Sequence, residues 1–175
     1  MMDNIIYKSN NIIPWDTQSA FKMTCYTGTE EKDLIFCYFK AYVCRSDLVV
    51  CTYTFLQNPK GKKDLTFVLS LGGRTVKVVF GYDGIDAVTA DGGGVQTDKV
   101  KLNVFKSNDE QGFYWCGELT FDKRFIREIL HGVLCEGDTV GLNLIQNFED
   151  GEHGSVFADG KGGFDAVGEF AISDY

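Results

Sequence analysis

Residues 65–80 read LTFVLSLGGRTVKVVF, and this stretch decides the fold class. Two runs in which every second residue is apolar flank a Gly72-Gly73 pair. A period of two places alternate side chains on one face of a strand, and glycine accepts the positive φ of a tight turn. The stretch therefore predicts a β-hairpin. The side chains predicted to point inward are Leu65, Phe67, Leu69, Leu71, Val76, Val78 and Phe80.

Alternation of the same kind continues on both sides of this hairpin and predicts further strands. They are expected at 34–44, 48–56, 99–105, 113–121, 139–146 and 166–172. The segments 81–97 and 148–164 are rich in glycine and are predicted to be long surface loops, the first with at most one short strand at 87–89. Within 48–56 the two faces of the strand carry Val49, Cys51, Tyr53 and Phe55 on one side and Thr52 and Thr54 on the other.

One short helix is expected after the strand at 113–121. Asp122 can cap its first turn, and Gly132 follows its last. The apolar stripe of this helix consists of Phe125, Ile126, Ile129 and Leu130. Many short strands and one helix predict an all-β fold: a two-sheet antiparallel β-sandwich of jelly-roll or immunoglobulin-like type, as a single domain over 1–175. A closed barrel is the alternative that periodicity leaves open.

Composition narrows the classes of partner. The chain has 175 residues and a formal net charge of −8, and no basic run in it is longer than Lys62-Lys63. Proteins that bind phosphate backbones neutralise them with Lys and Arg, so nucleic acid is not an expected partner, and neither is an anionic membrane. The start, Met1 to Lys8, lacks the basic and apolar regions of a signal peptide. This predicts a cytoplasmic location, or an extracellular one if a leader has been removed.

The chain contains six cysteines and no CxxC motif, which argues against a zinc ribbon. Four of the six lie within apolar strand-like runs, and no export signal is visible. We therefore expect reduced and mostly buried thiols.

Three ordered stretches resemble a known family. They are Lys40 to Val50 leading to Asn58-Pro59, then Gly112 to Trp115 with Glu118 to Phe121, and finally Gly137 to Leu144 with Val167 to Phe170. Together, over about 12–172, they resemble family 9 carbohydrate-binding modules and the wider DOMON-like sandwiches. Such modules hold sugar between two loop tryptophans, one after an Asn-Pro pair and one before the last strand. Here Lys60 occupies the first position, and 160–164 has no tryptophan.

The resemblance therefore implies a non-catalytic binding module for a carbohydrate or a related small ligand. Its binding loops would lie after Asn58-Pro59 and before the last strand, with Lys77 matching the family's basic side chain on a central strand. Sugars need a flat apolar face and convergent hydrogen-bond donors. The predicted ligand residues are Lys60, Lys77, Tyr82, Phe157, Lys161 and Phe164. With Lys60 and Lys161 as donors, an anionic or heavily hydroxylated ligand is expected.

Other functions stay open at this point. A sandwich that has lost sugar binding would serve as an interaction or assembly module, which is the main alternative. A His131–Cys135 nucleophile pair would indicate an enzyme. No cofactor is expected, although the acidic groups Asp83, Asp86 and Asp91, and Glu149 to Glu152, suggest structural calcium without forming a recognised motif.

Overall fold

The computed structural model describes residues 4–26, 36–56, 65–110, 112–147, 153–158 and 166–175. Its strands are β1 (Asn4–Ser9), β2 (Phe21–Lys22), β3 (Cys25–Tyr26), β4 (Phe36–Cys44), β5 (Asp47–Leu56), β6 (Leu65–Leu71), β7 (Arg74–Gly81), β8 (Gly84–Ala90), β9 (Gly93–Val95), β10 (Lys101–Asp109), β11 (Gly112–Phe121), β12 (Thr139–Asn147), β13 (His153–Ser155) and β14 (Gly168–Asp174). The helical elements are the 3-10 turns η1 (Trp15–Thr17) and η2 (Thr97–Lys99) and the helix α1 (Lys123–Ile129).

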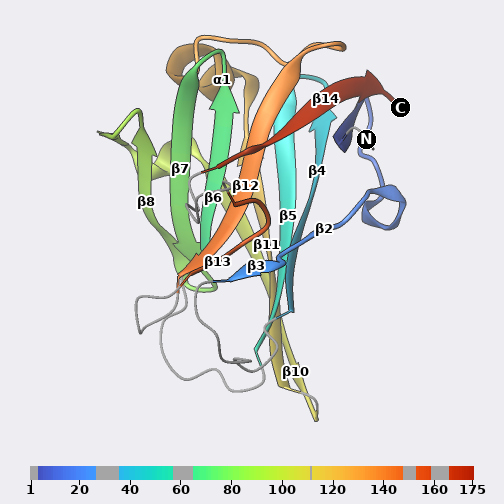
Figure 1. Cartoon of the computed structure of the whole chain (residues 1–175), viewed down its shortest axis with the longest axis vertical. Helices are drawn as coiled ribbons and strands as arrows, with labels where there is room; N and C mark the ends of the chain where they lie inside the picture. The colour runs from blue at the N-terminus through green and yellow to red at the C-terminus, as the bar shows by residue number, and fades with distance from the viewer. Residues whose placement is uncertain (1–3, 27–35, 57–64, 111, 148–152, 159–165) are drawn as a thin grey trace.

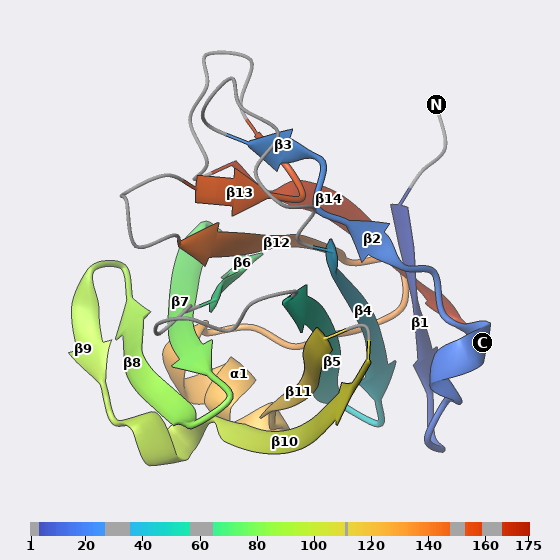
Figure 2. The same ribbon diagram turned by 90° about the horizontal axis from the view of Figure 1, so that it is seen from below.

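The strands form a curled sheet in the order β10-β11-β5-β4-β1-β14-β12-β6-β7-β8-β9. Its two halves face each other across one core, with α1 at one end (Figures 1 and 2). The prediction of an all-β sandwich with one short helix is confirmed. Among the described residues no ladder joins β10 to β8 or β9, so the sheet curls without closing there as a barrel would.

The first strand departs from the antiparallel pattern. β1 pairs in parallel with both β4 and β14, for example Tyr7 with Tyr42 and Ile5 with Ala171. It thereby joins the two halves of the sandwich. The sequence analysis did not assign this strand, because 4–9 is too short to show a clear alternation. Ile6 is buried, but the adjacent Ile5 is exposed.

The hairpin at 65–80 forms as predicted. β6 and β7 pair in register from Leu65 opposite Phe80 to Leu71 opposite Arg74. All seven side chains predicted to point inward are buried in the main core. The other face of β6 is covered as well, since Thr66 and Val68 are also buried. Burial of both faces is a property of a central strand, and β6 lies between β12 and β7.

The faces of β5 are arranged differently from what its aromatic residues suggest. Thr52 and Thr54 point into the core and are fully buried, whereas Cys51, Tyr53 and Phe55 are only half-buried on the outer face. The Thr52 hydroxyl donates to the Gly117 carbonyl at 3.1 Å, so the polar group is satisfied inside the sandwich. On the outer face three rings stack across neighbouring strands: Tyr38 on Tyr53 at 5.2 Å, and Tyr53 on Tyr114 at 6.1 Å between ring centroids.

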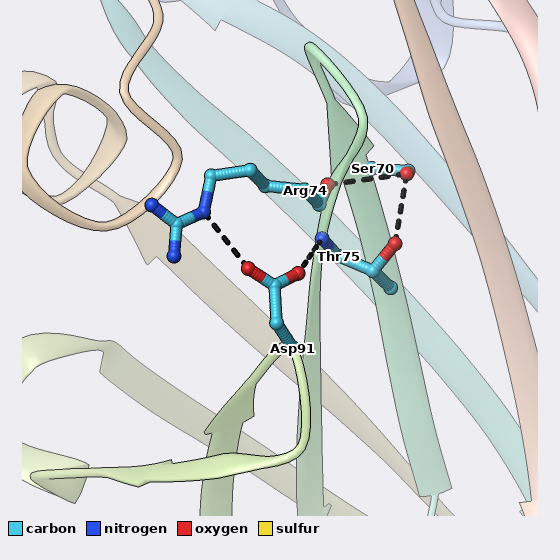
Figure 3. Close-up of polar contacts among 4 residues, drawn as sticks. All are labelled: Ser70, Arg74, Thr75 and Asp91. Atoms are coloured by element: carbon cyan, nitrogen blue, oxygen red, sulfur yellow. Dashed lines mark hydrogen bonds and ion pairs between the residues drawn. The ribbon is translucent and has the colours of Figure 1, made fainter.

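The segment 81–97, expected to be a loop, is in fact largely strand. It contains β8 and β9, joined at a turn where Asp91 and Gly92 both have positive φ. The Asp91 carboxylate accepts hydrogen bonds from the Thr75 amide at 2.9 Å and from Arg74 Nε at 2.8 Å (Figure 3). These bonds lower the pKa of Asp91. Nearby, the Ser70 hydroxyl donates to the Arg74 carbonyl, which links β6 to the same corner.

Two further boundaries differ from those that the sequence predicts. β10 continues to Asp109, beyond the end expected at 105. β13 lies within the predicted loop 148–164, of which the structure describes 153–158. The helix was predicted correctly, because the Asp122 side chain accepts from the Phe125 amide and Phe125 and Ile126 are buried. Gly132 lies against Leu71, where a Cβ atom would approach its side chain to 2.7 Å.

The expectation of mostly buried thiols is wrong for the described cysteines. Of the five described as free, Cys37 is buried, Cys44, Cys51 and Cys116 are half-buried, and Cys135 is exposed. Cys51 lies on the outer sheet face because the threonines of β5 point inward, and Cys116 of β11 lies opposite Tyr53 on the same outer face. Within the described residues no helix is long and apolar enough to cross a bilayer.

Candidate functional site

A surface pocket lies where the two halves of the sandwich approach each other without pairing, between the β7–β8 turn and β10. We call it the seam pocket. It has a volume of about 590 Å³ and is lined by Tyr82, Asp83, Gly84, Ile85, Thr97, Asp98, Leu102, Val104 and Lys106. In Figure 2 β8 and β10 approach each other at one end, and the chain passes from β9 to β10 through η2.

Tyr82 provides the aromatic surface of the seam pocket. It follows β7 and continues the alternation that points Val76, Val78 and Phe80 inward. Its ring therefore points toward the sandwich interior. The ring makes edge contacts with Phe113 at 5.5 Å and Trp115 at 6.4 Å between centroids. These contacts fix the ring position, while the side chain remains half-buried and accessible from the pocket.

Charged groups surround this ring. Lys106, from β10, places Nζ 5.0 Å from the centroid of the Tyr82 ring, a cation–π arrangement. Asp83 lies in the β7–β8 turn, and Asp98 lies in η2. The Thr97 hydroxyl is a further polar group, and Leu102 and Val104 supply apolar wall. The pocket therefore combines a ring, hydrogen-bond acceptors and donors within one concave surface.

The structure does not bring all predicted ligand residues to this pocket. Lys77 lies on the opposite face of β7, where it is paired with Val68 of β6 and Thr89 of β8. Phe157 packs against β14, where its ring lies edge-on to Phe170. The ring is so close to Gly168 that a Cβ atom added there would lie 2.4 Å from it. Lys60, Lys161 and Phe164 lie outside the described residues.

Asn143 is a structural residue that the sequence analysis did not single out. It is fully buried on the outer side of β12, in the row of Val68 and Lys77. Its amide nitrogen donates to the carbonyls of Phe157 at 2.8 Å and Ala166 at 2.6 Å. Its oxygen accepts from the Phe157 amide at 3.1 Å. In the sequence, this role is indicated by a polar asparagine inside the otherwise apolar run Val140 to Ile145.

The other predicted features can also be placed. The described residues contain no cluster of three or more potential metal-ligating side chains, and Asp91 pairs with Arg74 instead. Glu149, Asp150 and Glu152 lie outside the described residues. Glu118 accepts a long hydrogen bond from Asn103 at 3.5 Å on the outer sheet face. Trp115 is buried in the core, as its strand face predicts.

Fold and pocket together define a β-sandwich with a concave surface pocket that contains one aromatic ring. No known sequence family matches the chain, and no curated protein is similar to it in sequence. Solved structures are similar in fold over nearly the whole chain.

A family 9 carbohydrate-binding module from Caldicellulosiruptor kristjanssonii, in complex with cellotriose, aligns with a TM-score of 0.64 at 11% identity, covering 98% of this chain and 94% of that one. Its complex with glucose gives a TM-score of 0.62 at 12% identity, covering 98% and 95%. A protein from Bacteroides uniformis ATCC 8492, described as carbohydrate-binding, gives 0.68 at 10% identity, covering 96% and 97%. The chain has the fold of the family 9 modules, as its sequence resemblance implied.

Proposed function

We propose that this protein is a non-catalytic module that binds carbohydrate in the seam pocket. The observation that carries the proposal is the half-buried Tyr82 ring inside a cavity that also presents carboxylates, a hydroxyl and an ammonium group. The apolar C–H face of a pyranose packs on such a ring, and its hydroxyls need partners when water is removed. The fold shared with the cellotriose-bound module supports the proposal.

In this arrangement the lining residues have separate roles. Tyr82 stacks against the sugar ring, and Leu102 and Val104 contact its apolar edge. Asp83 and Asp98 accept hydrogen bonds from hydroxyls, while Lys106 and Thr97 donate to them. Lys106 is long and flexible, so its ammonium can move from the ring face to a hydroxyl when the sugar arrives.

Calorimetric titration with cellotriose and a panel of neutral oligosaccharides tests this site. We expect Tyr82→Ala to weaken binding about threefold to tenfold, because a ring contact of this kind contributes about 0.5–1.5 kcal/mol. Tyr82→Phe, which keeps the ring, should bind nearly as wild type does. Phe105→Ala is the matched control, since Phe105 is an exposed ring on the outer face of β10. Equal binding by wild type and Tyr82→Ala would contradict the assignment.

Lys77 distinguishes the seam pocket from the loop site that the family resemblance implies. Lys77→Ala should leave binding unchanged if the sugar lies in the seam pocket, because that side chain is on the other face of β7. Lys60, Lys161, Phe157 and Phe164 remain predicted ligand residues of the loop site. The sugar would lie in the loop site if alanine substitution of Lys77 and of these residues abolished binding while Tyr82→Ala still bound as wild type does. Incubation with the same oligosaccharides should give no cleavage products.

The alternative function is an interaction module without sugar binding. The outer face of β4, β5 and β11 supports it, since the stacked rings of Tyr38, Tyr53 and Tyr114 are only partly covered and Phe105 beside them is 65% exposed. A glycan array separates the two functions. Binding to a defined set of glycans favours the first, and an array without any signal favours the second.

A further inference from the structure

The seam pocket carries more negative than positive charge. Two carboxylates, Asp83 and Asp98, and one ammonium, Lys106, line it. The other lining residues are neutral. The expectation of an anionic ligand rested on Lys60 and Lys161, which lie outside the described residues.

The Tyr82 ring already accepts a cation. Lys106 Nζ lies 5.0 Å from the ring centroid, within the range of an attractive cation–π contact. The contacts of the Tyr82 ring with Phe113 and Trp115 are edge contacts. Lys106 is exposed and belongs to a different strand, so a ligand ammonium can replace it at the ring face.

We infer that, among sugars, the seam pocket prefers those that carry a protonated amine, such as oligomers of glucosamine. This inference rests on the proposed carbohydrate-binding function and concerns the same pocket. The ammonium of the sugar would pair with a carboxylate and approach the Tyr82 face, and the pyranose C–H groups would contact the ring as for a neutral sugar. A uronic acid would instead place its carboxylate near two like charges, which disfavours binding.

The experiment compares three ligands of equal length in the same buffer: a glucosamine trimer, its N-acetylated form and a galacturonic acid trimer. Calorimetry at low salt should give the tightest binding for the free amine, then the N-acetylated trimer, then the acid. We expect a preference of about threefold to tenfold for the amine over its N-acetylated form, because partly exposed ion pairs are individually weak. The preference should shrink in 0.5 M sodium chloride as the charges are screened.

Two variants separate the pocket from the overall charge of −8, which attracts any cation. Asp98→Asn removes one carboxylate from the pocket and should weaken binding of the amine more than binding of the N-acetylated trimer, because the asparagine oxygen still accepts hydrogen bonds from hydroxyls but cannot form an ion pair with an ammonium. Glu128→Gln removes the same charge from an exposed position on α1 and should leave the preference intact. An identical effect of both variants would overturn the inference, since it would show attraction to the whole surface.

The outcomes for function and specificity are distinct. Equal binding of the three trimers, or tighter binding of the acid, overturns the amine preference and leaves the carbohydrate-binding function standing. A preference for the amine that Tyr82→Ala does not weaken overturns the assignment to this pocket. Absence of binding to any trimer at millimolar concentration overturns both the function and the preference.

Discussion

The hairpin β6–β7 and the strand β5 show the same alternation in sequence but bury opposite kinds of residue. In β6 and β7 the large apolar side chains point into the core. In β5 the small threonines point inward and Tyr53 and Phe55 outward. The interior beside β5 is filled by Trp115 and Phe80, which lie edge-on at 6.0 Å. These large rings, from β7 and β11, leave room for only a small side chain at Thr52 of β5. A period of two therefore identifies a strand, whereas the volume available inside decides its inward face.

The largest expected effect is on the β6 side of this comparison. Phe67→Ala should lower the free energy of unfolding by about 3–5 kcal/mol, because the ring is fully buried and its removal leaves a cavity. Phe105→Ala, at an exposed ring, should change it by less than about 0.5 kcal/mol. Denaturant unfolding followed by fluorescence measures both. Similar losses for the two variants would show that the inner face of this half has been assigned wrongly.

A smaller effect tests how full the interior is beside β5. A Cβ atom on Gly117 would lie 3.0 Å from Trp115, 3.1 Å from Phe80 and 3.1 Å from the Thr52 hydroxyl. Gly117→Ala should therefore cost about 1–3 kcal/mol of stability through overpacking. Gly94→Ala is the control, since no atom lies within 4 Å of the added methyl group. If Gly117→Ala is as stable as the control, the interior has spare volume and the argument for inward threonines fails.

The smallest effect concerns the corner that joins β8 and β9 to β7. The Thr75 amide and Arg74 hold the pKa of the Asp91 carboxyl below its ordinary value of 3.8. A lowered pKa in the folded state means that the carboxylate stabilises the fold above the ordinary pKa, and that this contribution is lost as pH falls through the lowered value. The difference in Tm between wild type and Asp91→Asn should be larger at pH 6 than at pH 2. A difference that persists unchanged at pH 2 would indicate a backbone effect of the substitution instead.

Local sequence predicted the strands with a strong apolar alternation and the capped helix, because those signals are contained within each segment. It allowed one short strand at 87–89, inside β8, but predicted neither the full length of β8 nor β9, because their glycine and aspartate content is also typical of loops. Tyr82 could be selected as an aromatic residue outside the expected strands. Asp98 and Lys106 could not be linked to it, because they meet it only where β10 approaches the β7–β8 turn. That proximity depends on how the whole sheet curls, so local periodicity cannot predict it.

The position of β1 has a consequence for biosynthesis. Ile5 lies opposite Ala171, so the strand that joins the two halves of the sandwich receives one of its two partners only after the whole stretch between these residues has been made. During translation, β4 and β5 can pair early, but β1 lacks its β14 neighbour until β14 itself has been made. Contacts between residues so far apart in sequence form slowly, and unpaired strand edges are prone to associate with other chains in the meantime. The nascent protein is therefore most exposed to misassembly and to chaperone binding just before β14 leaves the ribosome.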